Sequence, residues 1–271
     1  SSPRARHTAA NLGLDWRKAT GTGRGGRIRE RDVLALRVSP APLPSPVSLT
    51  RRAIAEKMLT SHHSTAPVTL MSTIDATTLV RLREQLKTEA KSSESIVPTY
   101  TDLFIKLAAT ALEQHPVLNS RWENEQIIPA KSIHVGIAVD TDNGLLVPVI
   151  RDVPRLSLKT VANQTRTLIE RARLRQLKAN ELQGGTFTVT SLGSLGIDAF
   201  TPIINSPECA ILGVGRIRRC PVVLDEQIVI RDQVTLCLTF DHRLTDGAPA
   251  ARFLQTLTSL VEKPEFLLRD E

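Results

Sequence analysis

The sequence contains few aromatic residues, few cysteines and no long apolar run. Aromatic side chains make up 3% of its 271 residues, which argues against the stacking platforms of single-stranded nucleic-acid binders. The three cysteines form no CxxC pair and no zinc-ligand spacing, so we expect a reducing compartment and no metal site. Apolar runs such as residues 147–150 fall far below the ~20 residues of a membrane-spanning helix, which excludes a transmembrane protein.

Positive charge is concentrated at the start of the chain. The whole sequence carries a net charge of +7, and residues 1–37 account for +6 of it, from nine basic and three acidic residues. The remaining residues therefore carry 7 − 6 = +1. The sequence begins with Ser1 rather than Met and has no signal-like apolar segment, so we expect it to be part of a longer protein.

A proline-rich stretch divides the chain. Residues 39–46 contain four prolines in eight positions, a composition that favours an extended, semi-rigid spacer. We therefore expect a small N-terminal domain at residues 1–37, a linker at 38–47 and a larger domain at 48–271. No internal repeat is visible.

The N-terminal piece has the pattern of two short helices around a glycine-rich loop. Residues 3–12 predict a helix that buries Ala9, Ala10 and Leu12, with Gly13 as its C-cap. The loop at 21–28 precedes a second helix that carries Val33, Leu34 and Leu36. A fold this small lies below the usual limit for independent stability.

The larger domain mixes helical and strand patterns. Helical spacing predicts helices over residues 51–61, 77–91, 101–114, 158–177 and 248–260. Strands are expected at residues 68–74, 133–139, 145–150, 186–190, 209–215, 227–230 and 234–240. An Asp-Asn-Gly turn at 142–144 joins the second and third of these strands as a hairpin. This order predicts an α+β sandwich rather than a doubly wound parallel sheet.

Three stretches carry candidate chemistry, and each has a structural alternative. The stretch 241–247, Asp-His-Arg-Leu-Thr-Asp-Gly, follows an apolar strand and presents His242 as a candidate general base; alternatively it is a charged surface turn. The strand at 186–190 presents hydroxyls that could stabilise an oxyanion; alternatively its threonines are ordinary strand residues. The glycine-rich loop lacks the strand and Lys-Ser/Thr ending of a phosphate cradle, so alone it indicates a flexible loop.

Together these motifs resemble those of the dihydrolipoyl acyltransferase component of 2-oxo acid dehydrogenase complexes. Their order and spacing carry the resemblance over nearly the whole chain. The N-terminal part is similar to the peripheral subunit-binding domain through the Gly-Thr-Gly, Gly-Arg-Ile and Asp-Val of residues 21–33. The larger domain is similar to the catalytic domain through Arg52, Ile54, Ala55 and Met58, and through the stretches at 144–150, 184–188, 203–215 and 241–247.

The resemblance implies a fold, an activity and a site. The fold would be α+β and related to chloramphenicol acetyltransferase, in a homotrimer that assembles into a larger cubic or dodecahedral core. The chain would move an acyl group from S-acyl-dihydrolipoamide to coenzyme A. His242 would act as general base, Asp246 would support the active-site loop, and Thr190 would stabilise the tetrahedral intermediate. Each active site would lie at a subunit interface, with His242 and Thr190 from different subunits and no metal required.

The resemblance also assigns a partner to the basic N-terminal domain. It would dock dihydrolipoamide dehydrogenase or the 2-oxo acid decarboxylase through Arg6 and Arg27, with Arg31 as a third contact, because arginine forks pair well with carboxylates. No lipoyl domain or Asp-Lys-Ala lipoylation hairpin occurs in the sequence, so the lipoyl group would be carried outside it. Residues 67–70, Pro-Val-Thr-Leu, depart from the family's frequent Pro-His-Phe-Thr.

Several alternatives stay open. The Thr-Ser-Leu-Gly stretch at 190–193 favours an acetyl group, with a branched-chain acyl group as the alternative. The chain could instead be a non-catalytic scaffold of the same family, although such homologues would be expected to lose His242. Nucleic-acid binding by the basic domain is a third hypothesis, and it predicts steep salt dependence. A bacterial cytoplasm and a mitochondrial matrix both suit the chemistry.

Overall fold

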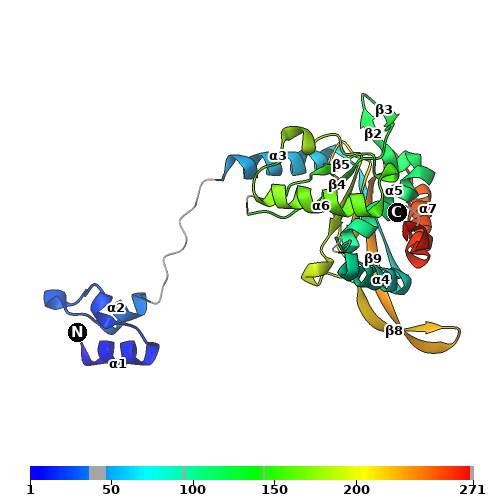
Figure 1. The fold of residues 1–271 in the computed structure, drawn as a ribbon. Coiled ribbons are helices and arrows are strands. Elements are labelled where there is room, and N and C mark those ends of the chain that lie inside the picture. The colour runs from blue at the N-terminus through cyan, green and yellow to red at the C-terminus, as the bar shows by residue number, and fades with distance from the viewer. Residues whose placement is uncertain (37–46, 94–95, 143, 269–271) are drawn as a thin grey trace. The chain divides into compact units, whose positions relative to one another are not determined.

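The structure, a computed structural model, describes residues 1–36, 47–93, 96–142 and 144–268. It contains two compact units, residues 1–47 and residues 48–271, which are taken in turn (Figure 1). Most of the expected linker, Arg37 at the end of the expected first domain, and Asn143 in the expected hairpin turn lie outside the described residues.

The first unit is built from two helices and two single 3₁₀ turns. Helix α1 (Pro3–Leu12) confirms the predicted bounds, and Gly13 ends it with a φ of 63°, in the left-handed region that glycine enters at little cost. The turns η1 (Trp16–Lys18) and η2 (Arg24–Gly26) lead to α2 (Glu30–Ala35).

The buried face of this unit differs from the prediction. Ala5, Ala9 and Val33 form its core, whereas Ala10 is exposed, Leu12 is only partly buried and Leu34 is 44% exposed. The i, i+4 pair Ala5 and Ala9 lies on one helix face, and the small alanines let α1 and α2 approach closely.

The second unit is a mixed α+β domain, as predicted. Its helices are α3 (Leu49–Ser64), α4 (Thr77–Ser93), α5 (Tyr100–Gln114), α6 (Leu158–Arg173) and α7 (Gly247–Glu262). Its strands are β1 (Pro67–Asp75), β2 (Ser120–Glu123), β3 (Gln126–Pro129), β4 (Val135–Ile137), β5 (Val149–Ile150), β6 (Phe187–Ser191), β7 (Ala210–Val214), β8 (Arg218–Leu224) and β9 (Gln227–Asp241). Single 3₁₀ turns complete it: η3 (Pro116–Asn119), η4 (Val153–Arg155), η5 (Ala179–Glu181), η6 (Gly193–Leu195) and η7 (Pro264–Leu268).

One seven-stranded sheet organises this domain, in the order β1-β9-β7-β6-β4-β5 with β8 paired to β9. The pairs β4–β6 and β6–β7 are parallel, and the other pairs are antiparallel. Helices α4, α5 and α7 contact strands of this sheet, and their apolar faces form the main core with it (Figure 1). The opposite face carries Thr188 and Thr190 of β6, because side chains alternate along a strand and Phe187 and Val189 point into the core.

The sheet departs from the predicted strands in three places. The segments at 227–230 and 234–240 were expected as two strands and are one continuous strand, β9. Strand β8 and the hairpin β2–β3 were not predicted. The hairpin around 142–144 is present as the short antiparallel pair β4–β5 and a bridge between Val139 and Leu146, so its strands are shorter than expected.

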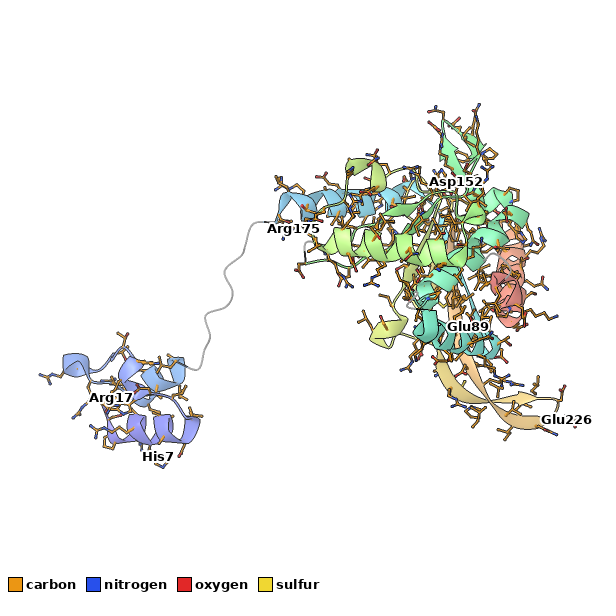
Figure 2. The ribbon with its side chains drawn as sticks, viewed as in Figure 1. His7, Arg17, Glu89, Asp152, Arg175 and Glu226 are labelled. Carbon is orange, nitrogen blue, oxygen red and sulfur yellow. The ribbon has the colours of Figure 1, made fainter. Side chains whose placement is uncertain are left out.

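Strands β8 and β9 continue beyond β1 as a two-stranded ribbon. Asp225 and Glu226 form its turn with φ values of 48° and 61°, as a two-residue hairpin requires, and Figure 2 shows Glu226 at the tip. Val223 and Ile228 face each other across the ribbon and are 75% and 79% exposed. No helix within the described ranges is long and apolar enough to cross a membrane.

Candidate functional site

His242 follows the last residue of β9, in a loop held on both sides by the sheet. Its backbone amide donates to the Ala66 carbonyl at 2.9 Å, and its ring lies 5.9 Å from the buried Phe240 ring. The His242 side chain is 45% exposed. The backbone is therefore fixed while the imidazole remains open to a substrate.

Asp241 holds this loop, a role the sequence did not reveal. Its side chain is 2% exposed and accepts hydrogen bonds from the Ala66 amide at 3.1 Å and from the amide and guanidinium of Arg243. Burial alone would raise the pKa of Asp241, but these hydrogen bonds outweigh it and lower the pKa below its ordinary value. Arg243 also stacks over Trp122, 5.0 Å from the ring centroid.

Asp246 lies at the end of the same loop, at the start of α7. It occupies the N-cap position of α7 without a side-chain hydrogen bond to the helix. Its side chain is 83% exposed and approaches His242 Nδ1 at 3.7 Å, beyond hydrogen-bond distance. Asp246 thus faces outward, whereas the buried Asp241 anchors the loop through its hydrogen bonds to Ala66 and Arg243.

Thr190 lies on β6, on the sheet face opposite α5. It pairs with Gly213 of β7, where a side chain would meet the Phe200 ring at 3.0 Å. Gly213 therefore lets Phe200 pack over the sheet beside Thr190. Ser191 alternates to the other face.

The structure does not bring His242 and Thr190 together within one chain. Thr190 pairs with Gly213, and Gly213 pairs with Cys237 of β9, five residues before His242. Five residues of strand and two strand spacings put the two groups about 20 Å apart. Within one chain, the surroundings of His242 and of Thr190 are therefore two separate candidate half-sites.

A hollow of about 400 Å³ lies next to the Thr190 end of β6. Its lining includes Arg83 of α4, Tyr100 of α5, Ser191 of β6 and Gly215, which follows β7. Arg83 stacks over Tyr100 at 4.8 Å and donates to the Pro98 carbonyl at 3.0 Å. This hollow lies on the α5 side of the sheet, the side that Ser191 faces and Thr190 does not.

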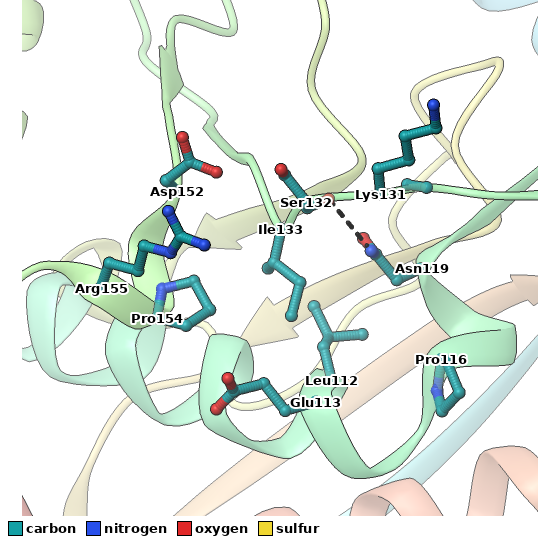
Figure 3. A pocket seen from close by; sticks show the side chains of 11 residues that line it. Leu112, Glu113, Pro116, Asn119, Lys131, Ser132, Ile133, Asp152, Pro154 and Arg155 are labelled. Atoms are coloured by element: carbon teal, nitrogen blue, oxygen red, sulfur yellow. Dashed lines mark hydrogen bonds between the residues drawn. The ribbon is translucent and has the colours of Figure 1, made fainter.

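A second hollow, of about 380 Å³, contains neither half-site. It lies between the end of α5 and η4, with Glu113, Lys131, Asp152 and Arg155 among its lining residues (Figure 3). The mixed charges around it define no single ligand. Among the described residues, no group of three His, Cys, Asp or Glu side chains is arranged to hold a metal ion.

The predicted docking arginines are exposed on the first unit. The Ser2 amide donates to the Ile28 carbonyl at 2.8 Å, so the start of α1, which carries Arg6, lies beside the loop end that carries Arg27. Arg6 Nε donates to Ser1 Oγ at 2.8 Å. Arg31 instead binds the Thr22 hydroxyl, at 2.9 and 2.8 Å, so it is partly engaged within the unit.

The glycine-rich loop is organised by Asp32 rather than being a flexible segment. The Asp32 carboxylate accepts hydrogen bonds from the Arg29 and Thr22 amides and the Thr22 hydroxyl, at 2.8, 3.0 and 2.7 Å. The Arg29 amide contributes most to lowering the pKa of Asp32 to about 2, followed by Thr22. Gly21 and Gly23 are needed because a Cβ at either would meet loop backbone at 2.2 and 2.5 Å.

Comparison with known families gives two matches that together span most of the chain. Residues 43–269 match the family described as 2-oxoacid dehydrogenases acyltransferase (catalytic domain). Residues 1–34 match the e3 binding domain.

Curated relatives align with nearly the whole sequence. The dihydrolipoyllysine-residue acetyltransferase component of the acetoin cleaving system of Bacillus subtilis is 41% identical, over 98% of this chain and 70% of the relative. The lipoamide acyltransferase component of the branched-chain alpha-keto acid dehydrogenase complex of the same organism is 34% identical, over 96% of this chain and 70% of the relative.

Solved structures share the fold of the second unit. A probable dihydrolipoamide acetyltransferase from Listeria monocytogenes is 40% identical, with a TM-score of 0.80 over 83% of this chain and 96% of that one. An Azotobacter vinelandii dihydrolipoamide acetyltransferase, studied for a serine, a histidine and an asparagine in its catalytic mechanism, is 35% identical, with a TM-score of 0.79 over 85% of this chain and 98% of that one. The cubic core of a pyruvate dehydrogenase multienzyme complex is 36% identical, with a TM-score of 0.79 over 85% of this chain and 98% of that one.

Proposed function

Because the chain belongs to the 2-oxoacid dehydrogenases acyltransferase family, we propose that it transfers an acyl group from S-acyl-dihydrolipoamide to coenzyme A. His242 and Thr190 are the catalytic residues, and Asp246 supports His242. The family match covers residues 43–269, which include both half-sites.

The spacing of the three residues carries this proposal. The serine and histidine named for the Azotobacter vinelandii enzyme are 52 positions apart, and its histidine and asparagine are four apart. In this chain 242 − 190 gives the same 52, and 246 − 242 gives the same four. Thr190 stands in place of the serine and keeps its hydroxyl, and Asp246 stands in place of the asparagine and keeps an acceptor oxygen.

His242 removes the proton from the attacking thiol. Its Nδ1 lies on the side of Asp246, so Nε2, on the opposite edge of the ring, is the nitrogen open to coenzyme A. A thiol is mostly protonated at neutral pH, and proton removal during attack contributes typically ~10²–10⁴-fold to the rate. Asp246 lies on the Nδ1 side of the ring, where it supports His242 without occupying the nitrogen that faces the thiol.

Thr190 stabilises the intermediate that follows. Attack of the thiolate on the acyl carbonyl gives a tetrahedral oxyanion, to which the Thr190 hydroxyl donates a hydrogen bond. Such a donor contributes about 10²–10³-fold. Collapse of the intermediate breaks the bond to the dihydrolipoamide sulfur, returns the proton from His242 to that sulfur and releases acyl-coenzyme A.

A complete site requires two copies of the chain. The separation of about 20 Å within one chain, from strand spacing, is too large for one acyl carbonyl to contact both residues. We infer that His242 of one copy faces Thr190 of the next, in a closed ring. The match to a cubic multienzyme core supports a homotrimer that assembles further.

The acyl group is acetyl. The relatives at 41% and 35% identity are named acetyltransferases, of an acetoin cleaving system and a pyruvate dehydrogenase complex, and acetyl is common to both. The branched-chain relative is 34% identical and makes a branched-chain group the second candidate. These bacterial relatives favour a bacterial cytoplasm over a mitochondrial matrix.

Residues 1–36 dock a partner enzyme. The e3 binding domain match and the adjacent exposed Arg6 and Arg27 support binding of dihydrolipoamide dehydrogenase through its acidic side chains, with Arg31 as a lesser contact. The lipoyl group arrives on a domain that residues 1–271 do not contain.

The direct test measures acyl transfer by the whole chain with a panel of acyl-coenzyme A donors and free dihydrolipoamide as acceptor, in the reverse direction. We expect acetyl-coenzyme A to give the highest kcat/KM, and His242→Ala to lower it by about 10²–10⁴-fold. A wild-type chain that transfers no acyl group would support the scaffold alternative, and an active His242→Ala variant would remove the proposed base.

A further inference from the structure

Glu208 is a buried carboxylate that neither half-site contains. It lies just before β7 and is 4% exposed. Its Oε2 accepts a hydrogen bond from Thr188 Oγ1 at 2.6 Å, and its Oε1 accepts one from Asn205 Nδ2 at 2.8 Å. Burial raises the pKa of Glu208 to about 7, against these hydrogen bonds and the charge of Lys57. Burying a carboxyl group costs free energy unless hydrogen bonds or a nearby charge compensate for the lost water. The bonds from Thr188 and Asn205 supply this compensation.

The first consequence concerns strand β6. Thr188 is 1% exposed and lies on the same strand face as Thr190, because the two are two positions apart. The bond from Thr188 to Glu208 joins β6 to the start of the neighbouring strand β7. It therefore fixes the strand two residues before the proposed oxyanion donor.

The approach to β6 is shaped around the same carboxylate. A side chain at Gly185 would place its Cβ 2.8 Å from Glu208 Oε1. The glycine thus leaves room for the carboxyl where the chain enters β6. The Thr188 hydrogen bond and the space left at Gly185 therefore both fix where Glu208 lies relative to β6.

The second consequence concerns helix α3. Lys57 Nζ donates to Asn205 Oδ1 at 2.6 Å, and Ser206 Oγ donates to Ser61 Oγ at 2.9 Å. Asn205 therefore bridges α3 on one side and Glu208 on the other. A continuous hydrogen-bonded chain runs from Lys57 through Asn205 and Glu208 to Thr188.

We propose that Glu208 is a positioning residue for acyl transfer, which sets Thr190 by holding β6 through Thr188 and which is itself held by Asn205 and Lys57 of α3. This inference rests on the proposed function. It predicts that loss of the Glu208 hydrogen bonds lowers kcat through Thr190 while substrate binding changes little.

The test compares Glu208→Leu, which keeps bulk but makes no hydrogen bond, with Glu208→Gln, which keeps an acceptor and a donor. Misplacement of a reacting group by about 1 Å lowers rates about 10²-fold, so we expect Glu208→Leu to lower kcat by about 10- to 100-fold with KM for coenzyme A within about twofold. Glu208→Gln should restore most of the wild-type kcat. A Glu208→Leu variant with wild-type kcat, or a Gln variant as impaired as the Leu variant, would overturn the proposal.

A double variant separates positioning from a general structural role. In a Thr190→Ala background, Glu208→Leu should cause little further loss of kcat, because the group it positions is absent. The same fold-loss in both backgrounds would show that Glu208 acts independently of Thr190. A wild-type chain without acyl transfer would instead contradict the proposed function itself.

Thr188→Val and Thr239→Val provide a matched pair if Glu208→Leu fails to fold. Both variants remove the hydroxyl of a buried threonine. Thr188 and Thr239 pair with the same residue of β7, Ile211, from its two sides. Thr188 binds Glu208, whereas Thr239 binds Thr69 at 2.8 Å. We expect only Thr188→Val to lower kcat, and equal losses in both variants would contradict the positioning role.

Discussion

The two compact units of this chain place their candidate functional residues in different ways. In the first unit, Arg6 and Arg27 are exposed side chains on a fold with a core of three buried residues, Ala5, Ala9 and Val33, and one carboxylate, Asp32, organises its loop. In the second unit, His242 and Thr190 lie at opposite parts of a large sheet, and each depends on hydrogen bonds between strands distant in sequence. The proposed docking surface is thus formed by residues of a small local fold, whereas the proposed catalytic site depends on the whole domain and on a second copy.

The largest expected effect tests whether the second unit needs that second copy. Alone, Thr190→Ala should lower the rate of acyl transfer by about 10²–10³-fold. His242→Ala alone should lower it by about 10²–10⁴-fold. Mixed assemblies of the two variants should regain about a quarter of wild-type acyl transfer, because in a closed ring one random interface in four pairs an intact histidine with an intact threonine. The measurement is acyl-coenzyme A formation by co-expressed chains.

The same mixture made from separately assembled, unexchanged variants is the control, and it should stay inactive. Absence of any recovery in co-expressed chains that do assemble would mean that the two residues do not share a site across chains.

A smaller effect is expected at the docking surface of the first unit. Arg27→Glu should weaken binding of dihydrolipoamide dehydrogenase by about 10- to 100-fold, because it removes one charge of a pair and places like charges together. Acyl transfer to free dihydrolipoamide should not change, because the half-sites lie in the other unit. Binding of the full chain is measured by calorimetry at two salt concentrations.

Lys18→Glu is the matched control for Arg27→Glu, since it makes the same change in charge at an exposed position of the same unit. Equal weakening by both variants would mean that the net charge of the unit, rather than a local contact at Arg27, attracts the partner. Equally tight binding of duplex DNA, falling steeply with salt, would favour the nucleic-acid alternative.

The smallest effect concerns the acid stability of the first unit. The pKa of Asp32 lies below its ordinary 3.8, at about 2, so its carboxylate stabilises the folded unit fully above the ordinary pKa and less as pH falls toward 2. Asp32→Asn should therefore destabilise the unit above about pH 4, with the difference from wild type shrinking toward pH 2. Trp16 fluorescence in a Trp122→Phe background reports on this unit during acid titration.

Asp15→Asn serves as the control, because it removes the same charge from a carboxylate of the same unit. The Asp15 carboxylate accepts a hydrogen bond from the Arg17 amide at 3.1 Å, in place of the three bonds that Asp32 accepts. A difference between Asp32→Asn and wild type that grows toward pH 2 would contradict the assigned direction of the Asp32 pKa.

Much of the fold could be predicted from the sequence because the signals involved are local. The bounds of α1, its Gly13 cap and the alternation that puts Thr188 and Thr190 on one face all follow from neighbouring residues. The predicted strands at 227–230 and 234–240 leave out the polar residues Arg231, Asp232 and Gln233, whereas pairing with β8 and β1 carries β9 through them. Strand β8 was missed because its exposed residues do not show the expected alternation.

The candidate site likewise combines features that local sequence signals predict with features that only tertiary contacts create. The motif at 241–247 identified His242, but it did not distinguish the role of Asp241 from that of Asp246. The difference depends on burial, since Asp241 lies between β1 and β7 and binds the Ala66 amide 175 positions away in sequence. Glu208 lies in the 203–215 stretch that carries the family resemblance, but its role depends on tertiary contacts, since its partner Asn205 reaches Lys57 across 148 positions.

The sequence by itself determined the charged N-terminal unit, the α+β class with its helices, and the motif that contains His242, because each is set by residues close together along the chain. Only the tertiary structure decided that His242 and Thr190 lie apart within one chain, that Asp241 anchors the histidine loop, and that Glu208 joins α3 to the strand of Thr190. These depend on strand register and burial, and hydrogen bonds between residues more than a hundred positions apart leave no periodic signal in the sequence.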